Sequence, residues 1–348
     1  MNDRSPTTID EQPSPLAECL ARVGLAPTRV PALLAAERFS RQQLALARAC
    51  LAARPRSPDL AVFAFGSLGR FEASSQSDLD LAFLYDGASI SREQAEGRRR
   101  EVVVALRSSL ALPIPEKTFD QAIDLRALTR NIGGRLDSNE TLTYRALLLT
   151  EGAWLDDAQT GQAMKHAVFS AYADATISRG RFLGSLGNDL HRYYRTLCMD
   201  YRHKVEELDK SWAIRVVKLR HSRKLWHLAN LALQCWLVDA ITDDQERDAC
   251  LARRIGWPSL VRLHGALEHF GAPELGAEAF VCHDVFLAAL AEVEVRDELA
   301  ALEYERCDDS AVYRGLRANA ERLDEATADI VELLFRRCRR FMVRFGIL

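Results

Sequence analysis

The sequence contains no apolar run that approaches the ~18 residues needed for a membrane-spanning helix. Its first fourteen residues are polar and include proline, so the apolar segment of a secretion signal is missing as well. These absences predict a protein that has no membrane partner and is located in the cytoplasm. Residues 1–15 are expected to form a disordered tail.

Closely spaced cysteines are also missing. The chain has eight cysteines, and no two lie within four residues of each other, so the paired spacing of a zinc ribbon does not occur. Their scatter over 348 residues differs from the dense pattern of small secreted disulfide scaffolds. We interpret them as free thiols in a reducing compartment.

The chain has no excess of positive charge and lacks two common catalytic signatures. Its formal net charge of -3 gives no overall attraction to nucleic acid or to an anionic membrane, so any basic surface must be local. A Walker loop and a Gly-x-Ser-x-Gly elbow are both absent. A P-loop kinase and an α/β-hydrolase are therefore not expected.

Strand patterns occupy one short part of the chain. Residues 60–65 form an apolar run beside a turn signal, which predicts a buried strand, and residues 78–84 predict a second strand. After these two strands we expect a helix over residues 91–110 and a third strand over residues 118–125.

Helical patterns surround this window. Residues 16–57 are expected to form an N-terminal helical arm, whose longer helix begins near residue 31. After residue 157 the pattern is helical almost to the end, over residues 182–208, 212–240 and 311–345. The fold class is therefore α+β: a small mixed-sheet domain at residues 58–157 joins the arm to a large all-helical C-terminal domain at residues 158–348.

Two acidic residues stand at the start of the second predicted strand. Asp78 and Asp80 are two residues apart, so on a strand their side chains point to the same face. Adjacent carboxylates repel each other, and a divalent cation removes that cost. Because magnesium prefers carboxylate and phosphate oxygens, the pair predicts a site for Mg²⁺ or Mn²⁺.

A glycine-serine pair follows the first predicted strand. Gly66 lets a phosphate approach the backbone, and amides at the start of a helix attract anions. The hydroxyl of Ser67 can donate to a phosphate oxygen. Metal ligands beside a phosphate-binding turn suit nucleotidyl transfer, in which an acceptor hydroxyl attacks the α-phosphorus between two metal ions and pyrophosphate leaves.

The motif of residues 66–72, Gly-Ser-Leu-Gly-Arg-Phe-Glu, followed by Ser-Asp-Leu-Asp at residues 77–80, resembles the signature of the DNA polymerase β nucleotidyltransferase superfamily. It is most similar to the branch that contains the bacterial PII-protein uridylyltransferases. The likeness covers about residues 60–86. It implies a nucleotidyltransferase domain, catalytic metal ligands at Asp78 and Asp80, and phosphate binding at Gly66 and Ser67.

The same resemblance extends to a third carboxylate and to the Gly-Arg-x-Glu element. Superfamily members usually carry a third metal ligand on a later strand, and Asp120 is the candidate here, with Asp124 and Glu116 as rivals. Arg70 and Glu72 match the element. We expect them to brace the loop by charge pairing, with Arg70 also a candidate phosphate contact.

The helical half contains a basic stretch over residues 191–227. On a helix, Lys218 and Ser222 lie one turn apart, where a cation and a hydroxyl can grip the β- and γ-phosphates. The superfamily uses a helical domain for this purpose, so both residues are expected to bind nucleotide. A solvated charged helix face is the simpler interpretation.

Two further features of the helical half admit other interpretations. The basic stretch also contains Tyr193, Tyr194, Tyr201 and Trp212, which could stack bases in an RNA-binding stripe. The run Cys-His-Asp at residues 282–284 suggests a metal site or a phosphohydrolase. Without partner histidines at a fixed spacing, we interpret it as structural.

The sequence thus predicts an enzyme that uses a nucleoside triphosphate such as ATP as its substrate. The acceptor would be a protein, an RNA or a small molecule, and the resemblance favours a protein. Two alternatives stay open. One is a non-catalytic nucleotide-binding regulatory module, and the other is a nucleotidyltransferase toxin or defence protein that acts on tRNA or on nucleotides.

Overall fold

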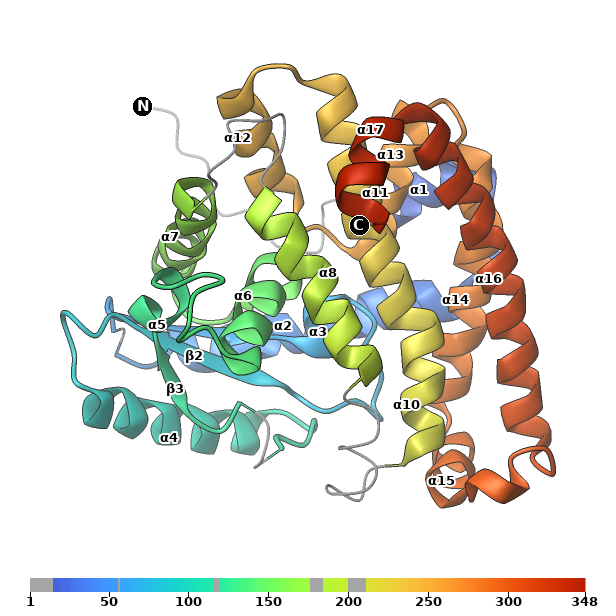
Figure 1. Cartoon of the computed structure of the whole chain (residues 1–348). Coiled ribbons are helices and arrows are strands. Elements are labelled where there is room, and N and C mark those ends of the chain that lie inside the picture. The colour runs from blue at the N-terminus through green and yellow to red at the C-terminus, as the bar shows by residue number, and fades with distance from the viewer. Residues whose placement is uncertain (1–14, 56, 116–118, 176–183, 200–210, 348) are drawn as a thin grey trace, which may run out of the picture.

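Figure 1 shows the chain as a computed structural model. The structure describes residues 15–55, 57–115, 119–175, 184–199 and 211–347. It is rich in helix and contains one small mixed sheet, an α+β arrangement. Within the described part of the chain, no helix combines the length and apolarity needed to cross a membrane.

The sheet has four strands in the order β3-β2-β1-β4. Strand β1 (Leu60–Ala64) pairs antiparallel with β2 (Leu81–Tyr85) and with the short β4 (Ala153–Trp154), whereas β3 (Ala122–Asp124) lies parallel to β2. Every residue of β1 and β2 is buried. Both strands are continuous apolar runs because helices cover both faces of the sheet.

Each face of the sheet has its own layer of helices. On one face, Val62 and Phe83 pack with α2 (Pro31–Ala52) and α4 (Arg92–Ser109). The other face, with Phe63, packs against three helices that lie above the sheet in Figure 1. These are α6 (Asn139–Glu151), α7 (Ala158–Ala175) and α8 (Gly184–Met199).

The C-terminal half is all helical. Its elements are α10 (Trp212–Lys218), a π-helical turn (Leu219–Arg223), α11 (Lys224–Ala240), α12 (Asp244–Arg254), α13 (Ser259–His269), α14 (Gly276–Ala291), α15 (Val293–Ala301), α16 (Ala311–Arg337) and α17 (Arg339–Phe341). Helix α1 (Pro15–Arg22) and the start of α2 pack into the same core. The N-terminal arm is therefore part of the helical body, and α2 links that body to the sheet.

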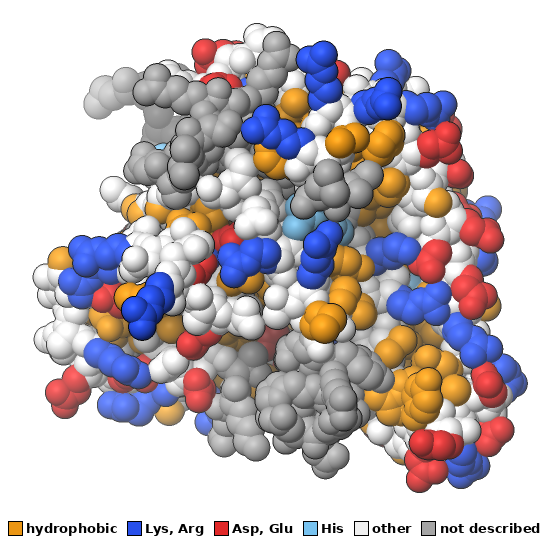
Figure 2. All heavy atoms as spheres, in the orientation of Figure 1, with side chains coloured by type: hydrophobic (Ala, Val, Ile, Leu, Met, Phe, Trp, Pro, Cys, Tyr) orange, Lys and Arg blue, Asp and Glu red, His pale blue; other side chains and the backbone are white. Residues whose placement is uncertain are grey.

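A second hydrophobic cluster crosses the expected boundary at residue 157. Phe63 and Phe65 of the sheet region share this cluster with Val168 of α7, Leu190 of α8 and Trp226 of α11. The sheet and the helical half are thus joined by common packing. Acidic and basic side chains alternate over the face of the molecule in Figure 2, as the small net charge leads one to expect.

Several predicted elements are confirmed with adjusted ends. The helix expected at residues 91–110 is α4, whose Ser91 cap forms a capping box with Gln94. The strand expected at residues 78–84 begins only at Leu81, so Asp78 and Asp80 lie in the segment before it.

The long helices predicted in the C-terminal half are interrupted or shortened. A π-helical turn divides the one expected at residues 212–240, and the one expected at residues 311–345 ends its regular part at Arg337. Of residues 182–208, the structure assigns helix only to Gly184–Met199, and residues 200–208 lie outside the described part, as does most of the expected N-terminal tail.

Candidate active site

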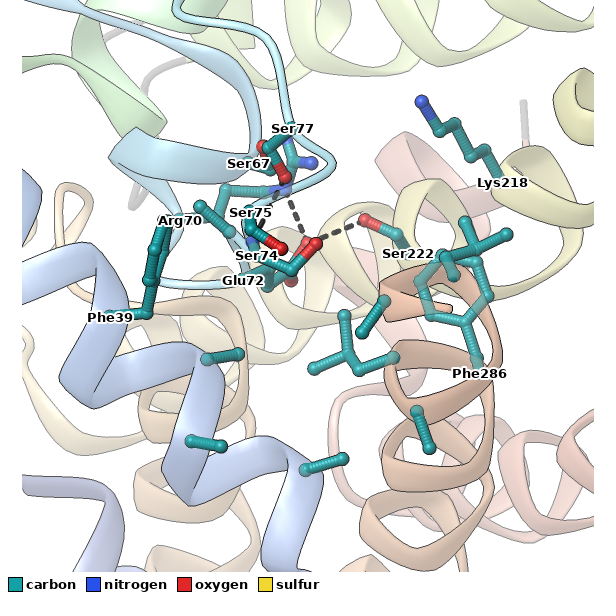
Figure 3. A pocket seen from close by; sticks show the side chains of 18 of the residues that line it. Phe39, Ser67, Arg70, Glu72, Ser74, Ser75, Ser77, Lys218, Ser222 and Phe286 are labelled. Carbon is teal, nitrogen blue, oxygen red and sulfur yellow. Dashed lines mark hydrogen bonds and ion pairs between the residues drawn. The ribbon is translucent and has the colours of Figure 1, made fainter. Parts of the chain in front are cut away.

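A cavity of about 590 Å³ lies between one end of the sheet and the helical half. Figure 3 shows it from close by, with the loop after β1 on one side and the π-helical turn on the other. Seven of the eight predicted site residues line it: Gly66, Ser67, Arg70, Asp78, Asp80, Lys218 and Ser222. Residues 150 positions apart in the chain are thus brought to one site.

The turn predicted to bind phosphate begins where β1 ends. Gly66 has a φ of +69° and opens the single-turn helix α3 (Gly66–Gly69). A Cβ atom at this position would lie 2.5 Å from Oδ2 of Asp80, so only glycine allows the carboxylate to sit against the turn. The amide of Gly66 donates to Oε1 of Glu151 at 3.0 Å, so this N–H is already used within the protein. The hydroxyl of Ser67 is the side-chain donor of the turn.

The two aspartates differ in their surroundings. Asp78 is exposed, whereas Asp80 is half-buried, and Phe65 N–H donates to the backbone oxygen of Asp80 at 2.9 Å. Burial raises the pKa of the Asp80 carboxyl, and the charge of Asp78 raises it further, against the opposing influence of Arg223. A divalent cation would relieve this repulsion, so the pair fits Mg²⁺ or Mn²⁺.

The third carboxylate is not brought to this pair. Asp120 is exposed in the segment before β3 and does not line the cavity. Its rival Asp124 caps α5 (Leu125–Thr129) and pairs with Arg126 at 2.7 Å, and Glu116 lies outside the described residues. Among the residues that the structure describes, no three His, Cys, Asp or Glu side chains form a metal-binding group. Substrate phosphates and water are further oxygen ligands that a cation at this pair would accept.

A buried ion network supports the turn, which confirms that Arg70 and Glu72 pair. The guanidinium of Arg70 donates to Glu72 Oε2 at 2.8 Å and to Glu151 Oε2 at 2.7 Å, and all three side chains are at least nine-tenths buried. Burial would lower the pKa of Arg70, but the charges of Glu151 and Glu72 outweigh it and raise that pKa. The positive charge of Arg70 is thus already paired with two carboxylates.

Glu72 also connects the turn to the helical half. Its Oε2 accepts a hydrogen bond from the Ser222 hydroxyl at 2.7 Å, and its Oε1 lies 3.2 Å from Nε2 of His283. Burial would raise the pKa of Glu72, but Arg70 and His283 outweigh it and hold that pKa well below its ordinary value. Ser222 was expected to donate to phosphate, and in this structure its single proton is directed to Glu72.

His283 belongs to the Cys-His-Asp run that was interpreted as structural. Asp284 of that run accepts a hydrogen bond from the amide of Leu33 at 2.8 Å, which ties α14 to the start of α2. Both side chains are buried among helices. Their contacts agree with the structural interpretation.

The aromatic residues of the basic stretch are used in packing. Tyr193 is buried against Trp226, Tyr194 stacks on His227 with ring centroids 4.3 Å apart, and Trp212 is buried. Tyr201 lies outside the described residues. The described rings therefore do not form an open platform for bases.

Two residues of this site were not found by sequence reasoning. Glu151 ends α6, beneath the turn, and Arg296 lies in α15 on the cavity wall. Neither belongs to a motif, and each reaches the site only through helix packing. The remaining wall includes apolar parts of α2 and α14, such as Ala32, Phe39 and Leu290, together with serines of the loop and Glu292.

No family model, no curated protein and no solved structure matches this chain. The functional argument therefore depends on the motif and on the geometry of the cavity.

Proposed function

We propose that the protein is a metal-dependent nucleotidyltransferase that moves a nucleoside monophosphate from a nucleoside triphosphate to an acceptor hydroxyl and releases pyrophosphate. The observation that carries the proposal is the contact between the Asp80 carboxylate and the Gly66 turn, in a cavity faced by Lys218. Metal ligands, a phosphate-binding turn and a cation from the opposite wall are the parts that this reaction needs.

Each group has a distinct task in the proposed reaction. Asp78 and Asp80 would hold the divalent cation, which when bound supplies electrostatic stabilisation of the attacking and leaving oxygens. The Ser67 hydroxyl would donate to a phosphate oxygen, and Lys218 would neutralise charge on the polyphosphate. The Arg70–Glu72–Glu151 network keeps the turn in place while the substrate binds.

The proposal is tested with full-length protein, the four α-labelled nucleoside triphosphates, and Mg²⁺ or Mn²⁺. A cell lysate supplies acceptors, and gel analysis before and after protease and ribonuclease treatment separates protein, RNA and small-molecule products. We expect label transfer, with a protein as the labelled product. If the folded protein transfers no label from any of the four nucleotides, the proposal is wrong.

Lys218 should make nucleotide binding depend on pH. Its side chain is exposed to the cavity, and desolvation by the surrounding protein lowers the pKa of its ammonium group to about 8, with Arg296 next in influence. Arg223 lowers the same pKa, while Asp78 and Asp80 raise it. Above pH 8 the free protein therefore loses this positive charge, although phosphate groups are fully ionised above about pH 7.

We expect the affinity for a nucleoside triphosphate to fall as the pH rises through about 8, whereas an ordinary lysine would stay charged to about pH 10. Calorimetric titration at a series of pH values measures this. The variant Lys218→Met should bind more weakly and lose the pH dependence in this range. An unchanged affinity up to about pH 9.5 would contradict the assignment.

A further inference from the structure

Arg296 is a half-buried arginine on the cavity wall, and among the described residues no carboxylate pairs with it, although Glu292 lines the same cavity. It lies in the first turn of α15, and its backbone amide donates to the backbone oxygen of Glu292 at 3.2 Å. Its guanidinium makes no hydrogen bond or ion pair with any residue that the structure describes. A guanidinium has five N–H donors in a planar fork, so an arginine that faces a cavity in this way is suited to an anionic ligand.

The other arginines of the cavity are already paired. Arg70 has two carboxylate partners, and Arg223 lies 3.5 Å from Glu151. Lys218, in contrast, has no hydrogen bond or ion pair to a described side chain, and Arg296 is close enough to act on it as a like charge. Two adjacent cations repel each other, and an anion between them removes the repulsion.

We propose that Arg296, together with Lys218, binds the terminal phosphate of the nucleoside triphosphate. This inference rests on the proposed function, and it adds Arg296 to the substrate-binding residues. Lys218 interacts electrostatically with Asp78 and Asp80 as well as with Arg296, so it lies within range of both groups. The reacting α-phosphate must lie near the two aspartates, so the remaining phosphates extend toward the helical wall.

The planar guanidinium matches a phosphate group with two parallel hydrogen bonds, which a lysine cannot make. A terminal phosphate carries more negative charge than a bridging one, so an arginine at this position should distinguish triphosphates from shorter chains. We therefore expect the substrate to be a compound with three linked phosphates, which should bind much better than one with a single phosphate.

Inorganic tripolyphosphate and pyrophosphate test the inference without knowledge of the preferred base. Calorimetric titration of the full-length protein, with and without Mg²⁺, should show binding of tripolyphosphate. We expect Arg296→Ala to weaken that binding roughly ten- to a hundredfold, because a charge-assisted pair is lost, and to weaken pyrophosphate binding less. Arg296→Lys should recover part of the affinity, and the exposed Arg340→Ala serves as the matched control.

Equal affinities of Arg296→Ala and wild type for tripolyphosphate would overturn the inference. It would also be overturned if the variant kept its KM for the nucleotide while the KM for the acceptor rose, because Arg296 would then bind an anionic acceptor. The two proposals fail separately. Tripolyphosphate binding that depends on Arg296 in a protein without transfer activity would refute only the enzyme function. Thermal unfolding of each variant checks that a loss of binding does not come from a loss of fold.

Discussion

Asp78→Asn and Asp80→Asn should each lower the rate of label transfer by at least roughly a thousandfold, because the loss of one metal-binding carboxylate removes several kcal/mol of transition-state stabilisation. Asparagine has nearly the same shape but no negative charge, so the cavity keeps its form. The measurement is the initial rate of transfer from an α-labelled triphosphate at saturating Mg²⁺.

The stability of Asp80→Asn distinguishes this loss from damage to the fold. At neutral pH the wild-type charge is held in a half-buried place beside Asp78, so its removal should leave the melting temperature unchanged or raise it. Asp329→Asn, at an exposed position of α16, is the matched control and should keep full activity. A clear drop in the stability of Asp80→Asn, or activity close to wild type, would contradict our assignment.

Asp120→Asn completes the series. In this structure Asp120 is exposed and outside the cavity, so its neutral variant should retain most of the activity. A loss as large as that of Asp80→Asn would instead identify it as the third ligand predicted from the superfamily resemblance.

Arg70→Met should destabilise the protein by about 3–5 kcal/mol, because it leaves the buried carboxylates of Glu72 and Glu151 without their common partner. The free energy of unfolding, measured with urea, gives this value. The control Arg98→Met breaks a largely exposed pair with Glu101, and we expect it to cost less than about 1 kcal/mol.

The same variant tests whether Arg70 is mainly a structural residue. If it only contacted phosphate, Arg70→Met would lower nucleotide affinity and leave the free energy of unfolding close to that of wild type. If it braces the turn, stability falls first. The double variant Arg70→Met/Glu72→Gln removes one of the two unpaired buried charges. Its glutamine oxygen still accepts the hydrogen bond from Ser222, so we expect part of the lost stability to be recovered.

Sequence-based prediction and structure agree best where the site is formed by residues that are close together in the chain. Residues 60–80 form most of a β-hairpin, and antiparallel pairing places the end of β1 beside the start of β2. Phe65, at the turn, therefore pairs with Asp80, and the glycine-serine turn must meet the two aspartates. No knowledge of distant packing is needed for this part of the site.

Helix packing placed the remaining groups. The sequence indicated a regular helix around Lys218, but a π-helical turn follows it and contains Ser222, whose hydroxyl donates to Glu72. Such a turn has no simple sequence signal, although π-helical turns are frequent at functional sites. Asp120 was chosen by analogy, and the structure leaves it outside the cavity.

The sequence by itself thus determined the two strands, the pair of aspartates and the glycine-serine turn, since pleat, turn and close approach depend on neighbouring residues. Only the tertiary structure decided that Glu151 anchors the turn from below and that Arg296 and Lys218 line the same cavity near each other. Those contacts join residues about 80 positions apart, and they depend on how whole helices pack.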